Sequence, residues 1–142
     1  MLEVKGIENG IVLDHITSGN GLKVFDKMNL AEVDYPVVLV MNVESKRLGR
    51  KDIIKIENTF DVDLTILGLI DSNISVNLIK NGKLVDKKQA ILPEIIHGLI
   101  ECHNPRCITN FDDYTKPTFK RISTDPLEYE CNYCEEVTEY KL

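Results

Sequence analysis

Residues 74–88 read ISVNLIKNGKLVDKK, and this stretch does most to decide the fold. Two runs with alternating apolar side chains, residues 74–80 and 83–88, flank the dipeptide Asn81-Gly82. A two-residue hairpin turn needs positive φ at both central positions, which asparagine and glycine adopt most readily. The stretch therefore predicts two antiparallel strands joined by a tight turn.

Further strands are predicted upstream of this hairpin. The loosely alternating stretch at residues 2–16 indicates one strand or a bent pair of strands. The β-branched runs at residues 37–43 and 50–57 indicate two more. With the hairpin, these strands are enough for one sheet.

Two helices are predicted between these strands. Thr17 or Ser18 can cap the first helix, and Asn58 or Thr59 can cap the second, over residues 61–70. Their predicted apolar stripes are Leu22, Val24, Phe25 and Met28 in the first helix, and Phe60, Val62, Leu64, Leu67 and Ile70 in the second.

The resulting order, β, α, β, β, α, β, β, leaves no room for long crossover helices. It indicates an α+β domain of the ferredoxin-like kind, with a mainly antiparallel sheet and two helices on one face. We predict that this domain covers residues 1–97, and that residues 95–101 form a short connecting piece. Residues 98–142 are predicted to form a small all-β domain with too few apolar side chains to fold without a metal or a disulfide.

Composition and charge narrow the class of protein. The 142 residues are 43% hydrophobic and 28% charged, as in ordinary folded domains. No apolar run suggests a signal peptide or a membrane span, so we expect a cytoplasmic protein with no membrane partner. Residues 98–142 carry 5 basic and 9 acidic side chains, and this negative charge disfavours a nucleic-acid partner.

All four cysteines lie in the predicted second domain. Cys102 and Cys107 are separated by four residues, and Cys131 and Cys134 by two. Two such chelating pairs can complete a tetrahedron around one ion, and four soft thiolates suit zinc. We predict one structural zinc per chain, because four protein ligands leave no open position for catalysis.

The cysteine spacing also allows two other interpretations. Two disulfides would be expected in a secreted chain, and four unrelated free thiols are the plainest alternative. His103 follows Cys102 directly, but with four thiolates available we expect it to be a surface histidine in the turn.

Residues 49–60 contain a basic strand. On a strand, Lys51, Ile53 and Lys55 share one face, while Ile54 and Ile56 share the other. One face therefore presents two ammonium groups, which could hold the phosphates of a nucleotide. On residue types alone, a solvated charged face is the alternative, and it is the more common arrangement.

The chain resembles the regulatory chain of aspartate carbamoyltransferase along essentially its whole length. The stretches that carry the resemblance are residues 12–16, 49–60, 76–77 and 92–94, together with the four cysteines in their order and spacing. The block Gly-Arg-Lys-Asp within residues 49–60 is the most specific of these.

The resemblance implies a function in the regulation of pyrimidine biosynthesis. It implies an N-terminal allosteric domain that binds CTP as inhibitor and ATP as activator, with UTP as a further effector. It also implies a C-terminal zinc domain that docks onto the catalytic chain, and dimers formed through the N-terminal domains. The chain itself is expected to be a non-catalytic subunit of a hetero-oligomer.

The resemblance also implies a nucleotide site. The residues carried over are Ile7, Val12, Asp14 and His15 on the base and ribose side, Lys55 and Lys87 at the phosphates, Asn77 and Ile79 completing the pocket, and Lys51 at its edge. The chain departs from the family pattern at three positions. Gly82 stands where some members carry an aromatic residue, Gln89 where a basic residue is common, and Lys5 where an acidic residue can occur.

Two other classes of function fit less well. A nucleic-acid-binding zinc ribbon would need a basic or aromatic-rich finger, and residues 98–142 are acidic. An enzyme would need a nucleophile beside a base, or an open metal position. His15, His97 and His103 have no identifiable serine or cysteine partner in the sequence, so we predict no catalytic residues.

Overall fold

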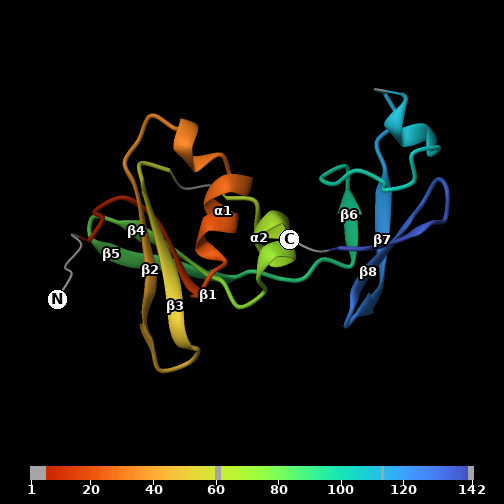
Figure 1. The fold of residues 1–142 in the computed structure, drawn as a ribbon. Coiled ribbons are helices and arrows are strands. Elements are labelled where there is room, and N and C mark those ends of the chain that lie inside the picture. The colour runs from red at the N-terminus through yellow and green to blue at the C-terminus, as the bar shows by residue number, and fades with distance from the viewer. Residues whose placement is uncertain (1–5, 60–61, 113, 141–142) are drawn as a thin grey trace. The chain divides into compact units, whose positions relative to one another are not determined.

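A computed structural model describes residues 6–59, 62–112 and 114–140 (Figure 1). The chain divides into two compact units, Met1–Leu92 and Pro93–Leu142. Lys5, Phe60 and Asp61, which figured in the sequence predictions, lie outside the described residues.

The first unit is an α+β domain built on one five-stranded sheet. Its strands lie in the order β2-β3-β1-β4-β5, and every neighbouring pair is antiparallel. Helices α1 and α2 lie on the same side of this sheet (Figure 1), which confirms the predicted ferredoxin-like arrangement. The elements are β1 (Gly10–Thr17), α1 (Gly21–Lys27), the 3-10 turn η1 (Leu30–Glu32), β2 (Val37–Ser45), β3 (Gly49–Glu57), α2 (Leu64–Ile70), β4 (Ser75–Lys80) and β5 (Lys83–Gln89).

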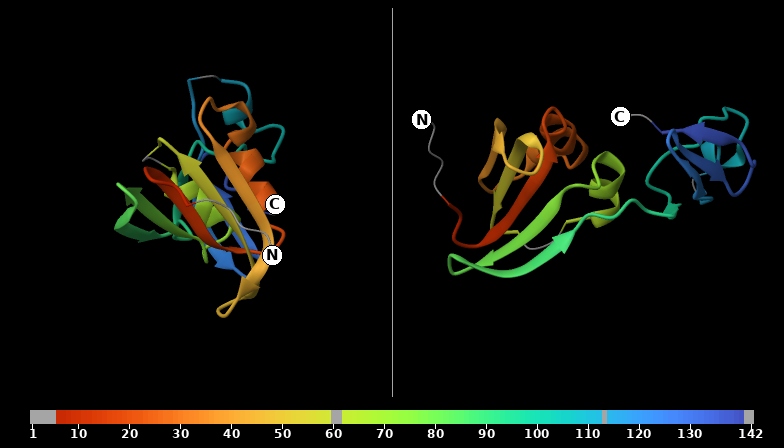
Figure 2. Two further views of the ribbon diagram at one scale, coloured as in Figure 1. Left: turned by 90° about the vertical axis from the view of Figure 1, so that its left-hand side faces the viewer. Right: turned by 90° about the horizontal axis from the view of Figure 1, so that it is seen from below.

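The predicted hairpin joins β4 to β5. Asn81 and Gly82 have φ angles of 52° and 74°, so both adopt the positive φ that the turn requires. The turn is also held from the segment before β1, because the backbone N–H of Gly82 donates to the carbonyl of Glu8 at 2.8 Å. Figure 2 shows the two strands as neighbours at one edge of the sheet.

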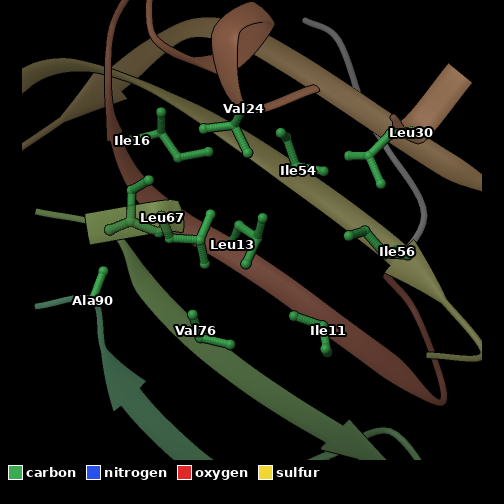
Figure 3. Close-up of a cluster of buried hydrophobic side chains, with 11 residues drawn as sticks. Ile11, Leu13, Ile16, Val24, Leu30, Ile54, Ile56, Leu67, Val76 and Ala90 are labelled. Carbon is green, nitrogen blue, oxygen red and sulfur yellow. The ribbon is translucent and has the colours of Figure 1, made fainter. Parts of the chain in front are cut away.

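The core lies between the sheet and the two helices. Alternate side chains of the strands meet Val24 of α1 and Leu67 of α2 (Figure 3). The fully buried strand residues in this cluster are Ile11, Leu13 and Ile16 of β1 and Ile54 and Ile56 of β3.

Both helices begin later than predicted. Neither Thr17 nor Ser18 caps α1, because Thr17 still belongs to β1 and the helix begins at Gly21. Leu22, which was expected in the apolar stripe of α1, is 49% exposed.

In α2 the cap is Asp63 rather than Asn58 or Thr59. Its carboxylate accepts from the backbone N–H groups of Thr65 and Ile66 at 2.9 and 3.3 Å, the bond pattern that favours aspartate at this position. Asn58 instead has a φ of 59° directly after β3.

Asp52 connects the middle of the sheet to the start of α1. Its side chain is fully buried, and it accepts hydrogen bonds from the backbone N–H groups of Gly19, Gly21 and Asn42 at 3.0, 2.9 and 2.8 Å. A Cβ at position 21 would lie 2.7 Å from Asp52 Oδ2, so only glycine fits this close approach. A buried carboxylate is stable here because three donors replace its water.

The second unit is a four-stranded antiparallel sheet in the order β6-β7-β8-β9. Ile96, Phe119 and Tyr129 are fully buried in it. The hydroxyl of Tyr129 donates to the carbonyl of Pro93 at 2.6 Å. The elements are β6 (Ile95–His97), the 3-10 turn η2 (Ile108–Asn110), β7 (Thr118–Thr124), β8 (Leu127–Cys131) and β9 (Val137–Glu139).

The unit boundary lies between Leu92 and Pro93, upstream of the predicted division after residue 97. Residues 95–97 were expected in a connecting piece, but they form β6 and pair with β7. Three residues are too short a run for a strand to be predicted from sequence, and this strand is defined only by its partner.

We predict that Asp52→Asn destabilises the first unit by about 2–3 kcal/mol, because an amide cannot accept from all three backbone donors as a carboxylate does. Hydrogen exchange of the β1 and β3 amides measures this unit separately from the second. Asp34→Asn, at an exposed carboxylate, should change exchange little. Equal exchange in the two variants would contradict a stabilising role for Asp52.

Candidate functional site

The four cysteine thiols lie together in the second unit. Their Sγ atoms are all within 4.8 Å of one another. Cys102 Sγ lies 3.5 Å from Cys134 Sγ, and Cys107 Sγ lies 3.8 Å from Cys131 Sγ. We refer to Cys102, Cys107, Cys131 and Cys134 as the cysteine cluster.

Two tight turns position the cluster. The side chain of Asn110 donates to the carbonyl oxygens of Cys102 and Asn104 at 3.0 and 2.8 Å, which folds the segment between Cys102 and Cys107 back on itself. Cys131 ends β8, and its carbonyl accepts from the N–H of Glu135 at 2.9 Å. Each pair of cysteines therefore comes from one short turn, as the spacing predicted.

The geometry of the cluster fits a tetrahedral metal ion. With metal–sulfur bonds of about 2.3 Å, the sulfur atoms of a tetrahedral thiolate site lie roughly 3.8 Å apart, close to the 3.5 and 3.8 Å that separate Cys102 from Cys134 and Cys107 from Cys131, across the two turns. All four cysteines are free thiols. Four thiolates would complete the coordination, so the site is suited to a structural metal.

The thiols differ in acidity. A hydrogen bond with the Thr109 hydroxyl, together with a backbone hydrogen bond from the same residue, lowers the pKa of Cys107 to about 7. Burial raises the pKa of Cys102 to about 12. His103 is not part of the cluster, and its Nδ1 instead hydrogen-bonds with the hydroxyl of Thr138.

A second group of predicted site residues lies on the face of the first sheet opposite the core. Strand register places Lys55 beside Val12, Val12 beside Asn77, and Asn77 beside Lys87. These four residues, which we call the cross-strand row, therefore run side by side across β3, β1, β4 and β5. Residues separated by many positions in the sequence are brought together here by pairing alone.

Asn77 has an unusual environment within this row. Its side-chain oxygen is buried and has no hydrogen-bond partner among the residues that the structure describes. A buried acceptor without a partner is costly, and an external donor would relieve that cost. The row therefore combines a carbonyl acceptor and an apolar side chain with an ammonium group on each outer strand.

Asp14 and Lys51 form an ion pair next to the row. Lys51 Nζ lies 2.9 Å from Asp14 Oδ1, and the two side chains are 18% and 21% exposed. Burial raises the pKa of Asp14, but the hydrogen bond from Lys51 and one from the backbone N–H of His15 outweigh it, so the pKa lies below its usual value. Asp14 is therefore an anionic acceptor at neutral pH.

A β-bulge presents Asp14 and His15 together. The register of β1 against β3 shifts between Leu13 and Ile16, and His15 has a φ of 57°. The two bulged residues oppose one residue of β3. Ile16 thereby returns to the core, while the side chains of Asp14 and His15 contact Lys51 and Ser75.

Two of the remaining predicted site residues, Ile79 and Ile7, lie outside the cross-strand row. Ile79 follows Asn77 by two positions in β4, and Ile7 is half-buried in the segment before β1. Sequence reasoning missed Ser75, which is fully buried and whose hydroxyl lies 3.0 Å from His15 Nδ1. Its position two residues before Asn77 on the same strand was the available signal.

Among the residues that the structure describes, no helix is long and apolar enough to cross a membrane.

The chain thus belongs to the class of two-module proteins in which an antiparallel α+β domain, here with a polar, charged sheet face, is followed by a small domain with four cysteines suited to a metal. Comparison with known families shows the same division. Residues 2–90 match the allosteric domain of the aspartate carbamoyltransferase regulatory chain, and residues 94–141 match the metal-binding domain of that chain. The chain belongs to the aspartate carbamoyltransferase regulatory chain family.

Curated relatives support this assignment along nearly the whole chain. The aspartate carbamoyltransferase regulatory chain of Clostridium tetani is 47% identical over 138 residues, covering 96% of both chains. That of Clostridium acetobutylicum is 44% identical over 137 residues, covering 96% of this chain and 94% of the relative. That of Bifidobacterium longum is 44% identical over 135 residues, covering 95% and 97%.

We predict that removing the metal unfolds the second unit and leaves the first intact, because metal ligation supplies folding free energy to a domain with a small core. A chelator or a thiol-modifying mercurial should release one metal ion per chain, as determined by elemental analysis. The β7 and β8 amides should then exchange freely, while those of β1 and β3 stay protected. Protected β7 and β8 amides in the metal-free chain would contradict this prediction.

Proposed function

We propose that this chain is a non-catalytic regulatory subunit that binds nucleotide effectors on its first sheet and contacts a catalytic chain through its second unit. The observation that carries the proposal is the cross-strand row, in which the carbonyl of Asn77 has no hydrogen-bond partner within the described part of the chain and Lys55 and Lys87 stand at the two ends. Membership of a regulatory-chain family gives this arrangement its functional context.

The chemistry of the row suits a nucleotide. Lys55 and Lys87 stand on either side of Val12 and Asn77, and flexible ammonium groups can converge on the phosphates of one ligand. Asp14 would accept from a base amino group or a ribose hydroxyl. CTP and ATP both carry such donors, and we propose them as effectors, with UTP as a third.

We propose that zinc is the resident metal of the cysteine cluster. Zinc favours four thiolates in a tetrahedron, and its lack of redox chemistry suits a structural role. In a reducing, cytoplasmic environment the thiols would stay available for ligation. Elemental analysis in the chelation experiment above identifies the metal.

We also propose that the first unit forms homodimers and that the second docks onto the catalytic chain. β2 is an edge strand that exposes Val38 and Met41, and an unpaired edge with apolar side chains is suited to association. In the second unit, Phe111 and Tyr114 are 74% and 97% exposed. Exposed aromatic residues are typical of protein–protein contacts.

We predict that Lys55→Ala and Lys87→Ala each weaken the binding of CTP and ATP by about 1.5–3 kcal/mol, the usual size of a hydrogen bond to a charged group. Isothermal titration of the full chain measures this. Lys27→Ala removes the same charge from the exposed end of α1, a helix on the opposite side of the sheet, and is the matched control. Equal affinities in all four proteins would show that the row is a solvated face.

We predict that Cys107→Ala abolishes association with the catalytic chain while nucleotide binding survives, because the second unit takes its shape only when the metal is bound. Sedimentation of the variant mixed with the catalytic chain measures assembly, and titration with CTP measures the first unit. Normal assembly would assign docking to residues 1–92 instead.

A further inference from the structure

A line of hydrogen bonds connects His15 to the far strand of the sheet. His15 Nδ1 lies 3.0 Å from Ser75 Oγ. The Ser75 hydroxyl donates to Gln89 Oε1 at 3.3 Å, and Gln89 Nε2 donates to the backbone carbonyl of Ser72 at 2.8 Å. Strand pairing places Ser75 opposite both Asp14 and Gln89, so the line follows the register of β1, β4 and β5.

The direction of every bond in this line follows from its last member. The carbonyl of Ser72 can only accept, so the amide of Gln89 must turn its nitrogen toward Ser72 and its oxygen toward Ser75. The single hydroxyl proton of Ser75 is then used by Gln89. Ser75 can offer only a lone pair to His15, so His15 Nδ1 must carry a proton.

The proton on Nδ1 determines the state of the other ring nitrogen of His15, Nε2. A neutral histidine with a proton on Nδ1 has a lone pair on Nε2 and is a hydrogen-bond acceptor there. Ser75 is 0% exposed, so water does not reach its hydroxyl while Gln89 stays in place. Gln89 itself is exposed on the edge strand β5, so its bond to Ser72 is what holds the amide in this orientation.

The ring is neutral at pH 7. Burial lowers the pKa of His15, and the carboxylate of Asp14 opposes this effect. The cations Lys51, Arg47 and Lys87 lower the pKa further, and it lies below its usual value. An unperturbed histidine is already mostly neutral at pH 7.

We propose that Gln89, through Ser75, fixes the tautomer of His15 and makes position 15 select a hydrogen-bond donor on the effector. The donor would be a base amino group or the ribose 2′-hydroxyl. The part concerning the ligand rests on the proposed nucleotide site, whereas the tautomer is a property of the chain alone.

The variant Gln89→Arg tests this mechanism, because it should reverse the direction of the hydrogen bond between Ser75 and His15. A guanidinium can donate to Ser72 and to Ser75, but it cannot accept. The Ser75 hydroxyl must then donate to His15 Nδ1, which moves the ring proton to Nε2 and turns that nitrogen into a donor. In Gln89→Met, a side chain of similar size has no amide, so it neither accepts from the Ser75 hydroxyl nor donates to it. The His15 ring should then populate both tautomers.

The first measurement is the tautomer of His15 by long-range proton–nitrogen NMR on the full chain, with His15→Gln used to assign its signals among those of His97 and His103. The proposal expects the Nδ1–H tautomer in the wild type, the Nε2–H tautomer in Gln89→Arg, and a mixture in Gln89→Met. An Nε2–H tautomer in the wild type, or the same tautomer in all three proteins, would overturn it.

The second measurement compares ligands of equal charge, so that the added charge of arginine cancels in the ratio. CTP and UTP differ in a base amino group, and CTP and 2′-deoxy-CTP differ in a ribose hydroxyl. For each pair, the ratio of the two dissociation constants gives the preference for CTP. In one of the two pairs, this preference should be about tenfold lower in Gln89→Arg than in the wild type, the size of one mismatched buried hydrogen bond. Which pair changes identifies the donor, and two unchanged ratios would overturn the selection of a donor.

Failure of the proposed nucleotide site would look different. Absence of CTP, UTP and 2′-deoxy-CTP binding to the wild type would refute that site and, with it, the selection at position 15. The NMR result in the free chain would still decide whether Gln89 fixes the tautomer.

Discussion

The register of β1 between β3 and β4 is the constraint on which the first unit depends. Because successive side chains of a strand point to opposite faces, this register sends Ile11 and Leu13 into the core and Val12 to the opposite face. A slip by one residue would exchange the two sets, burying polar groups and exposing the core. The same hydrogen-bonded pairing therefore builds both the hydrophobic core and the candidate nucleotide site.

β1 and β2 each bulge against β3, and Asp52 of β3 lies opposite the bulge of β2 and directly beside the bulge of β1. β1 bulges at Asp14 and His15, and β2 shifts register between Val40 and Val43, where Asn42 has a φ of 63°. A bulge removes backbone groups from the ladder, and the carboxylate of Asp52 accepts from Asn42 and from the turn that follows β1. The same carboxylate thus holds the turn into which the site-bearing end of β1 runs.

The two units use different means to remain folded. The first has a continuous apolar core under its sheet, which can offset the conformational entropy of folding by burial alone. The second has few large buried side chains, chiefly Ile96, Phe119 and Tyr129, and gathers its four cysteines beside them. We therefore expect folding of the second unit to depend on the metal, and with it the surface proposed for docking.

The sequence by itself determined the order of strands and helices, the Asn81-Gly82 turn and the pairing of cysteines into two chelating turns. These features depend on local φ preferences, on alternation and on short spacings, all of which act between neighbours in the chain. The strand β6 and the caps of both helices were not predictable in this way. β6 is defined by its partner β7, and several capping residues precede Leu64, of which only the folded chain selects Asp63 over Asn58 and Thr59.

Only the tertiary structure decided how the site residues meet. Lys55, Val12, Asn77 and Lys87 come from four strands, and their alignment depends on the registers of three strand pairs, which no single segment encodes. The same holds for Ser75 and Gln89, whose contact with His15 requires a bulge in β1 and the pairing of β4 with β5. Sequence patterns report what each segment prefers, whereas the direction of a hydrogen bond depends on every partner along the line.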